Sequence, residues 1–486
     1  MKKIILPLFM IFILFIKCYS TNVYFDNLHA QDAGNSDWTV SGAYSELSDL
    51  LDRKGFNVIK NRLLLTEVNN EIVDILVIPE PNNEFNSSEI INILNFVRNG
   101  GSLFLIGNHS GADRNGNGFD SVKTFNQFSY HFGFMFNNDS FTDVPLITKN
   151  HPLTQNIKKI AAFAASTINV LNSEKVTPFI WSKSGAPFGV VTSYGKGKVI
   201  AIGDSAVFDD GEAKDGEILH NVFNSIMFDF KQFGLNIFCY LSEKEFIQFE
   251  HIIPWNKIPE KNGFIIDISK ANYGADNFLA FAERLSKSGF TPYFNTEPLT
   301  ENLIKNSDFI LICEPGLKYS DSELNILRKF PDLKKIFVSY SRFNSLDKPY
   351  INELVKLLTN TQMKFSNNQI LDSANSIRGR AWTFLAHTEE FSSIVFSTCS
   401  IENIKKSDFI KLYSSSTSFS DGPTDIKKPP YPIITVSSDK KTMLAGFSVF
   451  TDYSYRESRY YSNNYHNVLH TTENFVEYLI DFMRNH

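Results

Sequence analysis

A polar loop with one histidine and two aspartates follows a short apolar run at residues 103–106. The run comes directly after a Gly-Gly turn, a pattern that is typical of a buried strand. In an open α/β sheet, ligands bind just beyond the carboxyl ends of the strands. We therefore expect any chemistry of this protein in the loop that contains His109, Asp113 and Asp120.

The same loop contains the first half of a sequence like that of an EF-hand calcium loop. Oxygen-bearing side chains occupy positions 1, 3 and 5, and a glycine occupies the sharp turn at position 6: Asp113, Asn115, Asn117 and Gly118. Position 12 is Thr124 rather than the bidentate glutamate, so Asp120 is the expected substitute. A calcium site at residues 113–120 is one interpretation, and a simple Asn- and Gly-rich turn is the other.

Two further groups of acidic and histidine side chains follow predicted strands. Asp26 and His29 come after an apolar run at residues 23–25, and Asp204 comes after a run at residues 199–202. Because the carboxyl ends of parallel strands lie at one edge of a sheet, we expect these loops to converge with the loop of His109.

Histidine imidazole with aspartate carboxylates suits Zn²⁺ or Mn²⁺, and such an ion activates water for hydrolysis. The residues expected to act in catalysis are His109, Asp26 and Asp204. The candidate metal ligands, including those of the calcium loop, are Asp26, His29, His109, Asp113, Asn115, Asn117 and Asp120.

Each of these residues also has a structural explanation. Asp26 would then bond the backbone of its own loop, Asp204 would cap the following turn, and the histidines would be ordinary polar residues at strand ends. A serine nucleophile is disfavoured, because the sequence around Ser110 lacks the G-x-S-x-G elbow and Ser205 follows the last strand of its unit.

Alternating strands and helices must position these loops. Strands that alternate with helices of this length indicate a mainly parallel sheet with helices on both faces. The predicted strands are 23–25, 56–59, 74–78, 103–106, 188–192 and 199–202, and the predicted helices are 41–54, 87–99, a segment after 121, and 219–230.

The second half of the chain repeats the first. Residues 308–315 match 74–81, and residues 287–290 match 53–56 at the same offset. The repeat predicts two tandem α/β domains of similar size. The expected organisation is a signal peptide at 1–20, a first domain at 21–233, a linker at 234–260 and a degenerate second domain at 261–486.

Most of the candidate site is lost from the second copy. Asp267 replaces Asp26, but no histidine follows it, and residues 337–342 replace the loop of His109 without its calcium-like tail. A packing role would be required equally in both copies. The loss therefore fits a functional site retained in the first half, although drift of surface loops explains the same pattern.

The N-terminus predicts export. A Met-Lys-Lys start precedes an apolar run at residues 4–16, shorter than the ~20 residues that a membrane helix needs. We expect cleavage after Ser20 and a periplasmic, cell-surface or secreted protein without a membrane span in the mature chain. A lipoprotein anchor at Cys18 is the alternative, although Lys17 replaces the small residue that such signals carry.

Composition excludes some classes of function. The formal net charge is −6 and no long basic run occurs, which argues against non-specific nucleic-acid binding. The remaining cysteines, Cys239, Cys313 and Cys399, are too few and scattered for a disulfide framework or a thiolate metal site.

Four segments of the sequence resemble the class I glutamine-amidotransferase-like superfamily, nearest to its ThuA-like and gliding- and intraflagellar-transport-like branches. They are Asp74-Ile-Leu-Val-Ile-Pro79, Asn99-Gly-Gly-Ser-Leu-Phe-Leu-Ile-Gly107, Asn150-His-Pro-Leu-Thr154 and Gly195-Lys-Gly-Lys-Val-Ile-Ala-Ile-Gly-Asp204. The resemblance implies a flavodoxin-like α/β fold in each half. Amidotransferases carry a nucleophilic cysteine at the position near Gly107 and Asn108, so amidotransferase activity is not expected here.

Two functions therefore remain open. The first is a metal-dependent hydrolase with its site in the first repeat. The second is a non-catalytic cell-envelope module that binds a glycan or a protein, as some members of the superfamily are thought to do. The tyrosine-rich run at residues 453–465 would stack on sugar rings in the second case, or would be an ordinary surface loop. The expected partner is a small-molecule or glycan ligand, and no motif in the sequence identifies it or a substrate.

Overall fold

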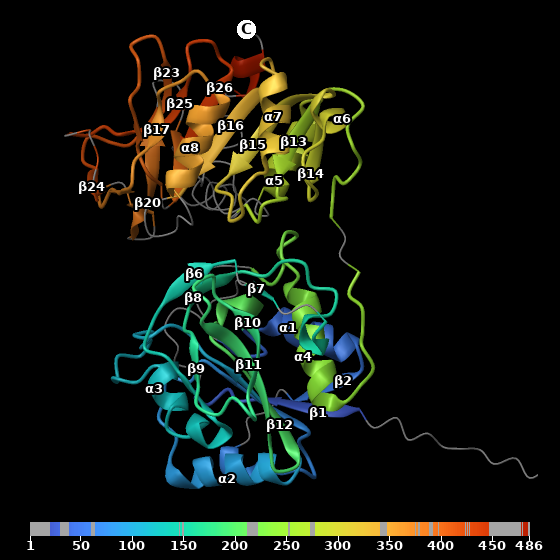
Figure 1. Cartoon of the computed structure of the whole chain (residues 1–486). Coiled ribbons are helices and arrows are strands. Elements are labelled where there is room, and N and C mark those ends of the chain that lie inside the picture. Colours follow the sequence, from blue (N-terminus) through green and yellow to red (C-terminus); the bar gives the residue numbers. More distant parts are fainter. Residues whose placement is uncertain are drawn as a thin grey trace, which may run out of the picture.

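The chain folds into two lobes, each built around one large sheet (Figure 1). The expected signal peptide, apart from Ser20, and the tyrosine-rich run lie outside the described residues. The residues described by this computed structural model are 20–29, 38–59, 64–144, 146–147, 150–210, 222–250, 253–272, 278–340, 348–374, 376–377, 380–387, 392–396, 398–422, 424, 426, 428–446, 478 and 480–484.

The first lobe comprises the described residues of 20–242. Its sheet has eight strands in the order β2-β1-β3-β4-β12-β11-β10-β7. Neighbours from β2 to β12 pair in parallel, and the pairs from β12 to β7 are antiparallel. The strands are β1 (Thr21–Phe25), β2 (Phe56–Ile59), β3 (Ile75–Pro79), β4 (Ser102–Ile106), β7 (Leu146–Ile147), β10 (Thr177–Trp181), β11 (Pro187–Tyr194) and β12 (Gly197–Ile202).

Four α-helices and several short elements complete this lobe. The small two-stranded sheets pair β5 (Phe134–Phe136) with β9 (Ile168–Val170), and β6 (Phe141–Asp143) with β8 (Ala162–Ala165). The helices are α1 (Ser45–Arg53), α2 (Ser87–Arg98), α3 (Ser121–Phe125) and α4 (Phe230–Ser242), with 3-10 turns η1 (Leu65–Glu67), η2 (Ser129–Phe132), η3 (Pro152–Thr154) and η4 (Ala206–Phe208).

The period-2 alternation of strand side chains builds two cores, one on each face of the sheet. In β1, Val23 and Phe25 join the cluster that contains α1 and α4, whereas Tyr24 joins the cluster that contains α2 and α3. The central strands are apolar throughout because both faces are covered, as expected for a parallel sheet.

The second lobe comprises the described residues of 263–446 and 478–484. Its sheet has the path β14-β13-β15-β16-β26-β25-β23-β20-β19, with β21 paired to β20. The strands are β13 (Gly263–Asp267), β14 (Thr291–Asn295), β15 (Ser307–Cys313), β16 (Lys334–Ser339), β19 (Ser376–Ile377), β20 (Arg380–His387), β21 (Ser392–Phe396), β23 (Phe409–Tyr413), β25 (Pro432–Val436) and β26 (Thr442–Gly446).

Helices cover both faces of this sheet as well. Residues of α5 share a cluster with one face, and residues of α6, α7 and α8 share a cluster with the other. The remaining elements are α5 (Leu279–Lys287), α6 (Glu301–Ile304), α7 (Asp321–Lys329), α8 (Lys348–Leu358), and the pairs β17 (Lys364–Phe365) with β22 (Ile401–Glu402) and β18 (Gln369–Leu371) with β24 (Phe419–Asp421).

The two sheets share one strand order through their first seven positions, from β2 to β10 and from β14 to β23. The repeat-matched segments occupy equivalent strands, since residues 74–81 contain β3 and residues 308–315 contain the end of β15. The predicted fold class, two tandem flavodoxin-like α/β units, is confirmed. Within the part of the chain that the structure describes, no helix has the length and apolar character needed to cross a membrane.

One predicted helix is wrong in position. The helix expected at residues 219–230 is absent from the described residues 222–229, and α4 begins only at Phe230. The Asp229 carboxylate accepts the backbone N–H groups of Lys158 and Lys159, at 2.8 and 2.9 Å, which fixes a turn before the helix. The expected linker therefore starts inside a helix that packs on the first sheet.

The segment predicted to be helical after residue 121 also differs. It divides into the short helix α3 and the 3-10 turn η2, with Gly133 in the left-handed region (φ 91°) closing the turn. The helix predicted at 41–54 is shorter than expected, because α1 starts at Ser45.

The first lobe contacts the second at loops that follow β13 and β15. The Lys159 ammonium donates to the carbonyl oxygens of Ile268 (3.2 Å) and Ser269 (2.7 Å). The Lys183 ammonium donates to the carbonyl oxygen of Gly316 at 2.9 Å. The carboxyl ends of β13 and β15 thus face the first lobe.

Replacing Phe238 should test whether α4 stabilises the first lobe. This ring is fully buried and lies 6.1 Å from each of the rings of Phe25, Phe56 and Phe104. We expect Phe238→Ala to lower the free energy of unfolding by about 3–5 kcal/mol, because it leaves a cavity among these rings. Urea unfolding followed by circular dichroism would measure it, with Ile91→Ala, at a side chain 59% exposed, as a control expected to stay within about 0.5 kcal/mol. Equal effects of the two substitutions would contradict the packing.

Candidate functional site

Four neighbouring strands of the first sheet end in buried polar residues. β1, β3, β4 and β12 are adjacent, and their carboxyl ends lead to the loops in question. Each loop has a buried polar residue close to the end of its strand: Asp26, Glu80, Asn108 and Asp204. The predicted convergence of loops at one sheet edge therefore exists, with β1 and β3 flanking the point where the strand order reverses.

Asp26 and His29 form a close pair at the end of β1. The Nδ1 atom of His29 lies 2.7 Å from Asp26 Oδ2, and Nε2 lies 3.7 Å from Glu89 Oε1. Burial lowers the pKa of His29, but the hydrogen bond and charge of Asp26, together with Glu89, outweigh it and leave the pKa raised. Both ring nitrogens thus face carboxylates of the protein. The imidazole ties the β1 loop to the first turn of α2.

Glu80 is a central residue of the site that the sequence reasoning did not select. It is fully buried at the end of β3 and has φ of 35°, in a region that favours glycine. Its Oε1 accepts from Arg114 Nε at 3.0 Å, and its Oε2 accepts from Ser205 Oγ at 2.5 Å. Glu80 therefore joins the loops that follow β3, β4 and β12.

A signal for Glu80 was present in the sequence. A Glu-Pro pair follows the strand in both repeats, as Glu80-Pro81 and as Glu314-Pro315. Glu314 is also fully buried, accepts a hydrogen bond from the Ser339 hydroxyl, and lies 3.8 Å from the Lys348 ammonium. A buried carboxylate with a cation and a hydroxyl donor thus occurs in both copies, as a structural role requires, although Ser205 and Ser339 lie at the ends of non-equivalent strands.

Asp204 is buried at the end of β12 and caps the following turn. Its Oδ2 accepts from Phe163 N at 2.6 Å, and its Oδ1 accepts from Ala206 N at 2.8 Å. Burial raises the pKa of Asp204 to about 7, opposed by these two N–H bonds and assisted by the negative charge of Glu80. A carboxyl group with such a pKa exchanges protons near neutral pH.

The loop of His109 holds itself in place. The backbone N–H of His109 donates to Asn108 Oδ1 at 2.7 Å, and the ring Nδ1 of His109 lies 2.8 Å from the carbonyl oxygen of Ser110. Among the described residues, no recorded contact joins His109 to Asp26 or to Asp204. The structure thus brings Asp26 and His29 together but does not add His109 to them.

The calcium-like loop is closed by its own backbone. Asp113 accepts N–H groups from Gly116, Asn117 and Gly118 at 2.9, 3.2 and 2.7 Å. Asp120 accepts from Gly111 N at 2.7 Å and, as the N-cap of α3, from Lys123 N at 2.8 Å. These carboxylates therefore already have donors, as an Asx-type turn would provide.

The two asparagines of this loop anchor it to the segment after β3. Asn117 Nδ2 donates to the carbonyl oxygen of Asn82 at 2.8 Å, and Asn115 Nδ2 donates to Asn83 Oδ1 at 3.0 Å. Across the described part of the chain, no group of three or more His, Cys, Asp or Glu side chains is placed to hold a metal ion.

The second lobe replaces the histidine contact with neutral groups. Asp267, the counterpart of Asp26, accepts from Asn295 Nδ2 at 2.7 Å, from Ser269 N at 3.2 Å and from the Tyr319 hydroxyl. Burial raises the pKa of Asp267. The counterpart of Asp204, in residues 446–448, lies largely outside the described residues.

Comparisons with known proteins gave no sequence match and only structural likenesses of low score. No known protein family and no curated protein matches this sequence. Among solved structures, the mmIFT52 N-terminal domain aligns over 47% of this chain and 100% of its own, at 15% identity and a TM-score of 0.35. A putative ThuA-like protein from Bacteroides uniformis aligns over 41% of this chain and 94% of its own, at 12% identity and 0.25. A cold-adapted β-galactosidase from Rahnella sp. R3 aligns over 46% of this chain and 31% of its own, at 13% identity and 0.30. At these scores no activity or ligand is transferred.

The raised pKa of Asp204 predicts a specific dependence of stability on pH. A carboxyl whose folded pKa is about 7, against 3.8 unfolded, stabilises the fold below pH 4 and loses that contribution as pH rises through 7. We expect the unfolding free energy of the wild type to fall by up to about 4 kcal/mol from this group between pH 4 and pH 8.

Asp204→Asn cannot titrate and should lack this part of the pH dependence. Its free energy of unfolding should also be lower by a roughly constant 1–3 kcal/mol. Two backbone N–H groups each bond one oxygen of Asp204, and the amide of asparagine has only one oxygen. Urea unfolding of both proteins across this pH range makes the comparison. Parallel curves would show that Asp204 does not titrate in the folded protein.

Proposed function

We propose that this chain is an exported, non-catalytic ligand-binding protein of the ThuA-like branch, with its first lobe stabilised by a polar network rather than equipped with a catalytic centre. The observation that supports this most is the pairing of the candidate catalytic groups with the chain itself. Asp26 is bonded to His29, Asp204 to two backbone N–H groups, and His109 to its neighbours.

A catalytic group must reach the reacting atoms at hydrogen-bond distance. Asp26 and Asp204 are fully buried, and the second nitrogen of His29 faces Glu89. A substrate would have to displace these internal partners before any of the three groups could act. This cost favours binding over catalysis.

The second candidate is the metal-dependent hydrolase, and one observation favours it. The pKa of Asp204, raised to about 7 by burial, suits a general acid or base. In that case Asp26, His29 and His109 would hold Zn²⁺ or Mn²⁺ after rearrangement of the loop, and Ca²⁺ would bind Asp113, Asn115, Asn117 and Asp120.

Elemental analysis combined with turnover assays would decide between these functions. The mature chain, residues 21–486, would be purified without chelator beside His109→Ala and Asp113→Ala, with Ser193→Ala as a control at an exposed position in β11. We expect no stoichiometric Zn or Mn in any sample, and no hydrolysis of ester, phosphoester or glycoside substrates above the rate in buffer.

Two results would change the assignment. Near-stoichiometric Zn or Mn that is lost in His109→Ala, with hydrolysis lost in parallel, would establish the hydrolase and reject the binding protein. Calcium lost in Asp113→Ala alone, with no turnover, would identify a structural ion and leave the binding function in place.

A further inference from the structure

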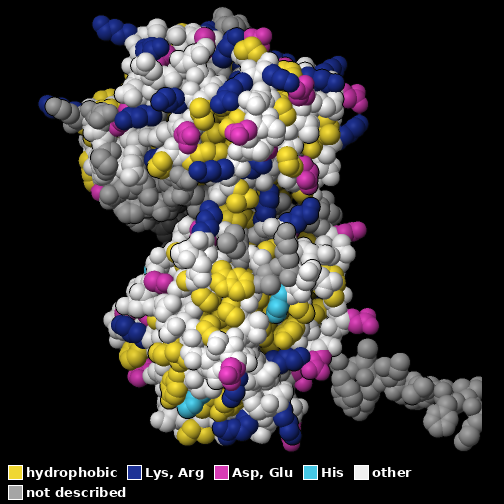
Figure 2. Space-filling view, viewed as in Figure 1, with side chains coloured by type: hydrophobic (Ala, Val, Ile, Leu, Met, Phe, Trp, Pro, Cys, Tyr) yellow, Lys and Arg dark blue, Asp and Glu magenta, His cyan; other side chains and the backbone are white. Residues whose placement is uncertain are grey.

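A large cavity lies at the junction of the two lobes. Its volume is about 870 Å³, within the range of roughly 300–1,000 Å³ that ligand pockets occupy. It is lined by residues 156–159, 224–229, 231 and 232 of the first lobe, by residues 248–250 and 253 of the connecting segment, and by Ile268, Thr296 and Glu297 of the second lobe. Figure 2 shows hydrophobic and basic side chains together at the narrow junction between the lobes.

This location is one where ligands are expected. Ile268 directly follows β13, and Thr296 directly follows β14, so the cavity lies beyond the carboxyl ends of the second sheet. Ligands of open α/β sheets bind at such ends, and small-molecule sites occur preferentially between domains.

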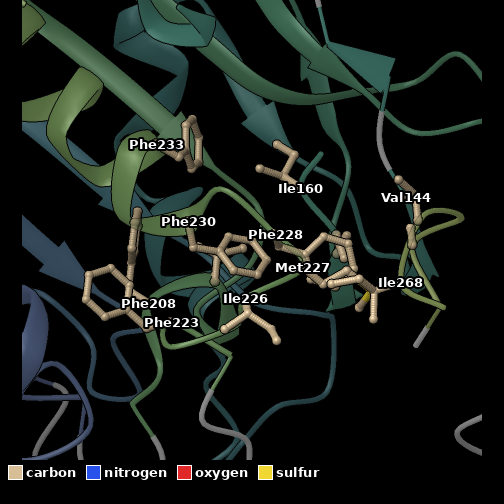
Figure 3. Close-up of a cluster of buried hydrophobic side chains, with 14 of the residues drawn as sticks. Val144, Ile160, Phe208, Phe223, Ile226, Met227, Phe228, Phe230, Phe233 and Ile268 are labelled. Atoms are coloured by element: carbon tan, nitrogen blue, oxygen red, sulfur yellow. The ribbon is translucent and has the colours of Figure 1, made fainter. Parts of the chain in front are cut away.

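The inner wall of the cavity is apolar. Ile226, Met227 and Phe228 form a loop before α4 and are all buried, and they share one hydrophobic cluster with Ile268 of the other lobe (Figure 3). Such a wall favours a ligand with an apolar body, because contact removes apolar surface from water.

Lys231 supplies a cation to the lining of the cavity. Its ammonium lies 5.6 Å from the centre of the Phe223 ring and 5.8 Å from that of Phe249, and burial lowers its pKa. Among the described residues it has no recorded hydrogen bond or ion pair. The charge of Glu46 acts on this ammonium and raises its pKa, although no hydrogen bond joins the two groups among the described residues. A half-buried ammonium in this position is electrostatically suited to an anion.

The other lysines of the cavity are already engaged. Lys159 donates to the carbonyl oxygens of Ile268 and Ser269, and Lys158 lies 3.7 Å from Glu297. Lys231 is therefore the lysine of this lining that is best placed to receive an acid group.

We propose that the cavity binds an organic anion with an apolar body, with its acid group at Lys231 and its body against Met227 and Phe228. This inference rests on the proposed binding function and assigns it a site and a class of ligand. The probe is sodium dodecanoate, a carboxylate with an alkyl chain, and dodecyltrimethylammonium is the control with equal chain length and opposite charge.

Isothermal titration of the mature chain, below the micelle concentration of each probe, tests the assignment. We expect saturable binding of dodecanoate to one site and no comparable binding of dodecyltrimethylammonium. Lys231→Met keeps most of the side-chain volume and should weaken dodecanoate binding at least about tenfold, since it removes a charge-assisted contact. Lys175→Met, at an exposed lysine outside this cavity, should leave binding unchanged.

A second measurement on the wild type avoids dependence on any variant. Dodecanoate should protect Lys231, and not Lys175, from an amine-reactive label read by mass spectrometry. Failure of dodecanoate to bind, equal binding of the two probes, binding unchanged in Lys231→Met, or equal labelling of Lys231 with and without dodecanoate would each overturn the cavity assignment. The proposed non-catalytic function is tested separately by the turnover assays. Metal-dependent turnover that requires His109 would reject that function without bearing on the binding of dodecanoate.

Discussion

The architecture of each lobe depends on one buried carboxylate at the end of the third strand of its sheet. Glu80 and Glu314 are fully buried, so each needs a cation and hydrogen-bond donors, because removing a partner from a buried ion pair costs several kcal/mol. Arg114 and Ser205 meet this need in the first lobe, and Lys348 and Ser339 meet it in the second. The carboxylate thereby ties together loops that follow separate strands.

A comparison of the two repeats distinguishes residues that the fold requires from residues that differ between the copies. Both copies keep the buried glutamate, but the serine bonded to it comes from different strands: Ser205 follows β12, whereas Ser339 ends β16, the counterpart of β4. The cation follows the equivalent strand in both copies, as Arg114 in the loop after β4 and as Lys348 at the start of α8. The first copy alone has the Asp26–His29 pair. The carboxylates and histidines of this edge are paired with one another or with the backbone.

The first lobe contacts the second lobe at the carboxyl ends of the strands of the second sheet. Lys159 and Lys183 bond carbonyl groups that follow β13 and β15, and so cover that edge with the first lobe. The covering is incomplete beside β14, where the cavity at the lobe junction remains. The second lobe contributes Ile268, Thr296 and Glu297 to the lining of this cavity.

The sequence by itself determined six strands of the first lobe, the sheet class and the duplication, because apolar runs and a repeated Glu-Pro turn are visible in it. It also placed Asp26, Asp204 and the loop of His109 at strand ends. It did not predict the short strands β5 to β10, between Phe134 and Trp181. Only the tertiary structure decided what these groups contact, since Glu80 bonds partners 34 and 125 residues away and Asp229 fixes the start of α4 by bonding residues 70 and 71 positions earlier. Burial and pairing over such separations leave no periodic trace in the sequence, so the roles of these carboxylates emerge only in the folded chain.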